Sequence, residues 1–138
     1  MNTKKILYGG IIGGIAFFFL GWLIYGIILT NYMMANGNQC AARPMDQFVW
    51  PALILSNLGW GFFVAVIFNW TNTLDWKDGA LKGALLGLLT SFSIDLGYYS
   101  TTTMYSSLAP LFVDILAVVV MVAIGGALIA WAMGTVKK

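Results

Sequence analysis

Four long apolar runs constrain the fold of this chain more strongly than any other feature: Ile6–Leu29, Pro51–Trp70, Ala80–Tyr99 and Leu108–Met133. A helix needs about 20 apolar residues to cross the hydrocarbon core of a bilayer. Only 9% of the 138 residues are charged, whereas a soluble domain carries about a quarter. Transmembrane β-strands would show alternating polarity, but these runs are continuous. The sequence therefore predicts an all-α membrane protein, a bundle of four transmembrane helices forming a single domain over residues 1–138.

The positive charges predict the orientation of these helices. If both termini lie in the cytoplasm, six of the seven Lys and Arg residues are cytoplasmic, and only Arg43 lies outside. The six are Lys4, Lys5, Lys77, Lys82, Lys137 and Lys138. Such a bias is typical of inner loops. The first apolar run is also longer than the core of a cleavable signal peptide. We therefore expect a retained first helix and a multi-pass protein with both termini cytoplasmic.

The composition excludes several kinds of chemistry. The chain has no histidine and no glutamate, which removes histidine-ligated haem, histidine-based zinc or copper sites and glutamate/histidine di-metal centres. Cys40 is the only cysteine, so an internal disulfide is impossible. A net charge of +2 gives no reason to expect nucleic acid. We expect no cofactor, no metal centre and no enzymatic activity.

Small residues line one side of the third run. Ala80, Ala84, Gly87, Ser91 and Asp95 fall within a sector about 80° wide at about 100° per residue. Small residues let helices approach closely in lipid, and an ionisable group rarely faces the acyl chains. We therefore expect the third helix to be central. The glycines predicted to pack helices together are Gly10, Gly14, Gly21, Gly83, Gly87 and Gly125.

One polar group from each helix falls at a similar depth. Tyr25, Asn57, Asp95 and Asp114 each lie about 6–9 Å below the outer hydrocarbon surface at 1.5 Å per residue. Ser91 can add an oxygen, and Tyr98, Tyr99 and Tyr105 can form an aromatic rim that favours a cationic ligand. The sequence therefore predicts a ligand- or ion-binding site at Tyr25, Asn57, Ser91, Asp95 and Asp114.

Two carboxylates in one layer of low dielectric constant cannot both stay ionised cheaply, and three arrangements are open. A cation bridges Asp95 and Asp114, or the two share a proton, or Arg43 folds down as a gate or counter-charge. A structural interpretation competes with these. Asp114 follows Pro110 by one turn and can stabilise the start of its helix through the dipole. Asn57 can equally form a hydrogen bond between helices.

The segment Gly21-Trp22-Leu23-Ile24-Tyr25-Gly26, the stretch Gly83–Gly87 and Asp114 resemble small bacterial four-helix integral membrane proteins of unknown function. This resemblance implies the four-helix architecture and a bacterial inner membrane, and it implies no site residue.

Two functions follow as hypotheses. The first is a protein with a polar, acidic pocket near the periplasmic face that binds or transports a cation, proton or small amine, as a homo-oligomer. The second is a structural or accessory subunit that docks into a larger membrane complex through its glycine-rich helix faces.

Overall fold

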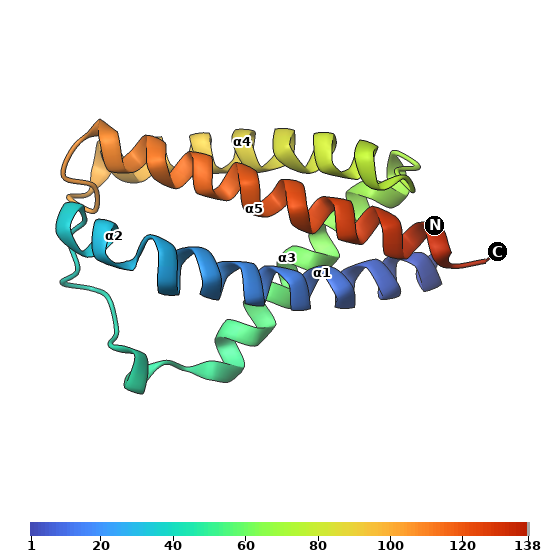
Figure 1. Cartoon of the computed structure of the whole chain (residues 1–138), viewed down its shortest axis with the longest axis horizontal. Coiled ribbons are helices and arrows are strands. Elements are labelled where there is room, and N and C mark those ends of the chain that lie inside the picture. The colour runs from blue at the N-terminus through green and yellow to red at the C-terminus, as the bar shows by residue number, and fades with distance from the viewer. Residues whose placement is uncertain (138) are drawn as a thin grey trace.

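The computed structural model describes residues 1–137 and is helical almost throughout (Figure 1). Lys138, one of the positive charges that predict the orientation, lies outside the described residues. The elements in order are α1 (Thr3–Leu23), the π-helix η1 (Ile24–Ile28), α2 (Thr30–Asn36), the 3₁₀ turn η2 (Met45–Gln47), α3 (Trp50–Trp70), α4 (Trp76–Thr101) and α5 (Leu108–Thr135). Four stretches are long and apolar enough to cross a membrane, namely Thr3–Ile28, α3, α4 and α5. The predicted four-helix fold is confirmed.

Two of the long helices, α1 and α4, begin where polar side chains cap them. Asn2 accepts a hydrogen bond from the backbone N–H of Lys5 at 3.2 Å, and α1 therefore begins at Thr3. Asp75 accepts from the N–H groups of Lys77 and Asp78 at 2.9 and 3.3 Å. This cap moves the start of α4 to Trp76, four residues before the predicted start of the apolar run. Such caps satisfy N–H groups that have no partner within the helix.

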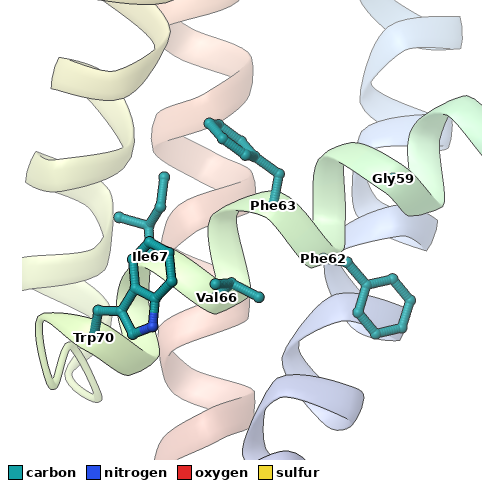
Figure 2. A pocket seen from close by; sticks show the side chains of 6 residues that line it. All are labelled: Gly59, Phe62, Phe63, Val66, Ile67 and Trp70. Carbon is teal, nitrogen blue, oxygen red and sulfur yellow. The ribbon is translucent and has the colours of Figure 1, made fainter. Parts of the chain in front are cut away.

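The central helix is α5, and the expectation that the third helix is central is wrong. α5 packs against α4 on one side and against α1 on the other, and it also touches α3. α3 crosses one face of this row obliquely (Figures 1 and 2). The small residues along one side of α4 serve its contact with a single neighbour, because α4 packs mainly against α5. A stripe of small residues therefore marks one very close contact and does not reveal how many neighbours a helix has.

Two glycine contacts hold the helices closest together. A Cβ on Gly83 of α4 would overlap the backbone carbonyl of Val122 in α5. A Cβ on Gly61 of α3 would overlap the backbone of Gly14 and Gly10 in α1. The predicted packing glycines Gly10, Gly14, Gly83, Gly87 and Gly125 all lie at such contacts. Gly21 does not, because nothing lies within 4 Å of the place its Cβ would take.

The hydrophobic core lies in the half of the bundle that holds the termini. Phe68 of α3, Ile129 and Met133 of α5 are fully buried there, and Ile6 and Phe17 of α1 pack against the same cluster. The first half of α3, by contrast, is exposed along Trp50–Ser56, because the oblique crossing carries it away from the row (Figure 1). Asp114, at the start of α5, lies in the opposite half of the bundle.

Candidate functional site

Asp114 is the centre of a polar cluster. The start of α5, which carries it, lies at the end of the bundle opposite the termini (Figure 1). Its Oδ1 accepts a hydrogen bond from the hydroxyl of Tyr25, and its Oδ2 accepts one from the hydroxyl of Tyr105 at 2.6 Å. Tyr25 comes from η1, Tyr105 from the connection between α4 and α5, and Asp114 from the second turn of α5. One half-buried carboxylate thus joins three segments that lie far apart in the sequence.

The π-helix is the element that presents Tyr25. The N–H of Leu29 bonds to the carbonyl of Ile24 at 2.7 Å, five residues back, which widens this turn of the helix. The side chain of Thr30 donates to the carbonyl of Tyr25 at 2.6 Å. Every backbone polar group needs a partner inside a membrane, and Thr30 supplies one for Tyr25. π-turns are rare in helices and frequent at functional sites.

Tyr105 is held in place by pairing between two loops. The N–H of Asn38 bonds to the carbonyl of Met104 at 2.9 Å, and the N–H of Ser106 bonds to the carbonyl of Asn36 at 3.1 Å. These bonds form an isolated antiparallel bridge between Gly37 and Tyr105. Burial raises the pKa of the Tyr105 hydroxyl, and the hydrogen bond to Asp114 raises it further. Tyr105 is therefore a neutral hydrogen-bond donor to the carboxylate over an extended pH range.

Asp95 lies beside this cluster and is more deeply buried than Asp114. Its side chain comes from α4, is 6% exposed, and has an oxygen, Oδ2, with no hydrogen-bond partner among residues 1–137. It is close enough to Asp114, Tyr25 and Tyr105 for their charges to interact. Ser91, one turn earlier, donates its hydroxyl to the carbonyl of Gly87 at 2.6 Å and so offers Asp95 no proton. Asp95 is therefore a buried acid with one oxygen that receives no hydrogen bond.

No cation compensates the two acids within the part of the chain that the structure describes. Arg43 is exposed and forms no ion pair there, so the pairing proposed for it as a gate or counter-charge is not formed in this conformation. The one ion pair found in residues 1–137 joins Lys82 to Asp78 at 2.7 Å in α4, near the opposite end of the bundle. Asp95 and Asp114 therefore share their layer with hydroxyl groups only.

Asn57 does not join the cluster. Its side-chain N–H donates to the carbonyl of Leu53 in the same helix at 2.8 Å, so it forms no hydrogen bond between helices either. Counting residues from the helix ends places polar groups at one depth only when the helices are parallel. α3 crosses obliquely, so Asn57 lies elsewhere. Tyr98 and Tyr99 are exposed. Of the tyrosines expected as an aromatic rim, Tyr105 alone reaches the acids, and sequence reasoning missed its role as a donor because the loop pairing that places it joins segments about 70 residues apart.

Two hollows on the surface of α3 are separate from this cluster. One is lined by Gly59, Phe62, Phe63, Val66, Ile67 and Trp70 (Figure 2). The other is lined by Ser56, Gly59, Trp60 and Phe63. Both linings are almost entirely apolar, as expected for a surface in contact with acyl chains. Neither hollow contains any of the aspartates or tyrosines of the polar cluster.

Comparison of the chain with protein-family models, with curated proteins and with solved structures finds no match. Within residues 1–137 no three His, Cys, Asp or Glu side chains gather as a metal site would require. The chemistry of this cluster is therefore that of two carboxyl groups and two phenol hydroxyls.

Proposed function

We propose that this small multi-pass membrane protein binds a proton or another small cation at Asp95 and Asp114. One observation carries the proposal: Asp95 is 6% exposed, leaves one oxygen without a partner, and lies beside a second carboxylate. A buried polar group without a hydrogen bond costs free energy. Such a group inside a membrane helix is a functional-site candidate by default.

Electrostatics favours a positive ligand at this place. Two carboxylates in a layer of low dielectric constant repel each other when both are ionised. The repulsion ends when a proton or cation neutralises one of them, and no Lys or Arg side chain does so within residues 1–137. Binding would therefore stabilise the folded protein as well as occupy the site.

The positive-inside bias supports an orientation with both termini in the cytoplasm. In that orientation the acids lie toward the periplasmic side of a bacterial inner membrane, the membrane implied by the sequence resemblance. A cation would then reach Asp95 after crossing only a thin part of the bilayer. Transport would further require release of the cation to the cytoplasm, along a path beside α4 and α5. Binding alone requires no such path.

A second function, docking as an accessory subunit, is favoured by one observation. Gly59 of α3 has no neighbour within 4 Å of where its Cβ would lie, and Trp60 and Phe63 beside it are exposed. Most other glycine faces are used inside the chain, however, as at Gly61 and Gly83. The accessory function therefore falls to the open glycine positions, Gly21 of α1, Gly59 of α3 and Gly97 of α4, where a partner helix or a second copy of this chain can pack.

The test is a titration of the purified protein in lipid nanodiscs. Thermal stability would be measured against pH and against sodium, calcium and methylammonium chloride at constant ionic strength. We expect stabilisation by a proton or by one of these cations, and loss of that effect in Asp95→Asn. Asp46→Asn is the matched control, because Asp46 is exposed in η2. Equal responses of the wild type and both variants would contradict a binding site at Asp95.

A further inference from the structure

We infer that the ligand of this site is a proton that is carried by Asp95 and hydrogen-bonded to Asp114, the carboxylate to which two tyrosines donate. This inference rests on the proposed function and deepens it by naming the ligand and the role of each acid. It starts from an asymmetry in hydrogen bonding: Asp114 has two donors, whereas Asp95 has an oxygen with none.

The tyrosines select the ionised form of Asp114. Hydrogen bonds donated to a carboxylate stabilise its charged state, and bonds to a charged acceptor are stronger than those between neutral groups. Tyr25 donates to Oδ1 and Tyr105 to Oδ2. Both phenols act as donors, so neither supplies a lone pair that would stabilise a proton on Asp114. The charge of the pair therefore stays on Asp114.

The surroundings of Asp95 select its neutral form. The groups that face it are Asp114 from α5, Tyr25 from the end of the first span and Tyr105 from the loop, while Ser91 precedes it in α4. None of these is a cation. Burial and a neighbouring negative charge both disfavour a second anion. A protonated carboxyl group, in contrast, has an O–H to donate.

Asp114 can accept a third hydrogen bond, from the O–H group of Asp95. A carboxylate offers about four lone-pair positions, and the two phenols occupy two of them. The O–H of Asp95 directed at Asp114 would leave one negative charge shared over four oxygens and satisfied by three donors. Release breaks the Asp95 O–H bond and passes the proton to water at the loop side, and rebinding reverses the step.

Larger ligands fit this set of donors less well. Calcium takes six to eight oxygen ligands and magnesium an octahedral shell, but the two phenol O–H groups point at the Asp114 oxygens that such a cation would need. A proton needs no coordination shell.

Infrared spectroscopy of the protein in nanodiscs tests the assignment. At neutral pH we expect the carbonyl-stretch band of a protonated carboxylic acid in the wild type. We expect the band to be lost in Asp95→Asn and kept in the control Asp46→Asn. Carbon-13 NMR of the Asp95 and Asp114 carboxyl carbons in labelled wild-type protein gives the same answer without a substitution, if a variant fails to fold.

Two results would overturn the inference, and they differ in whether the proposed cation site survives. Survival of the band in Asp95→Asn would show that Asp95 does not carry the proton. A wild type without the band would exclude a bound proton at neutral pH. In that case a shift of the carboxylate stretch on adding sodium, calcium or methylammonium chloride would preserve the proposed cation site, and the absence of any shift would remove both proposals.

Discussion

The hydroxyl of Tyr105 lies 2.6 Å from Oδ2 of Asp114, and this bond ties the loop between α4 and α5 to the second turn of α5. The same loop is paired with the end of α2 through Asn38 and Met104. Asp114 also accepts from Tyr25. The carboxylate therefore fixes the loop, the π-helix and α5 in one arrangement, and its loss would loosen all three.

Removing the Tyr105 hydroxyl should destabilise the protein. Tyr105→Phe deletes one hydrogen bond to a charged acceptor, a type that contributes about 1.5–3 kcal/mol. We expect the lower end of that range because Tyr105 is only half-buried. The free energy of unfolding in mixed detergent micelles measures the effect. Tyr99→Phe is the control, since Tyr99 is exposed, and equal stabilities of the two variants would contradict the role of Tyr105.

Alkaline pH should destabilise the protein through the same residue. The pKa of Tyr105 is raised in the folded state above the ordinary value of 10.0, first by burial. Above pH 10 the unfolded chain therefore loses a proton that the folded chain retains, and stability falls as pH rises. The contribution is complete below pH 10. Stability measured between pH 8 and 11 should fall less steeply in Tyr105→Phe than in the wild type, and parallel curves would count against it.

Two glycines in α3, two residues apart, should respond oppositely to alanine. Gly61→Ala places a Cβ against the backbone of Gly10 and Gly14, and backbone cannot move aside as a flexible side chain can. We expect a loss of about 1–3 kcal/mol from overpacking. Gly59→Ala has no neighbour within 4 Å and should be neutral or stabilising. Unfolding measurements on both variants decide this, and similar behaviour would mean that α1 and α3 are not in close contact.

Thr73 should be important at the opposite end of the bundle. It is fully buried, and its Oγ1 accepts from Lys82 at 2.8 Å and lies 2.7 Å from the hydroxyl of Thr71. Thr73→Val removes both contacts, at a cost of about 0.5–1.5 kcal/mol, since Lys82 keeps its ion pair with Asp78 and Thr71 keeps its bond to Ile67. Thr101→Val is the matched control because Thr101 is exposed and bonds only within its own helix. A loss in the control as large as in Thr73→Val would indicate a general effect of the substitution.

The sequence predicted the number of membrane-spanning helices and their approximate limits because hydrophobic length alone determines them. It also predicted that Tyr25, Asp95 and Asp114 lie together, since these residues come from three helices that run side by side (Figure 1). Counting residues from the helix ends is sufficient for such helices. The same count wrongly placed Asn57 beside these residues, because nothing in the second run reveals that α3 crosses obliquely.

The roles of Tyr105 and of α5 could not be read from the sequence. Tyr105 reaches Asp114 because Asn36–Asn38 pairs with Met104–Ser106, and that register depends on where two helices end. The glycines of α4 revealed a close contact but not that its partner, α5, is the helix surrounded by the others. Both properties are set by long-range packing, which local patterns do not encode.

The π-helix determines the direction in which the side chain of Tyr25 points. A wide turn holds one residue more than regular winding requires, so one residue can be deleted from Ile24–Ile28 without breaking the helix. Deleting Ile24 would rotate Tyr25 by about 100° relative to α1 and carry its hydroxyl away from Asp114. Deleting Ile28 would leave Tyr25 in place and rotate Thr30 instead. The length of this one turn therefore sets which side chain faces the acids.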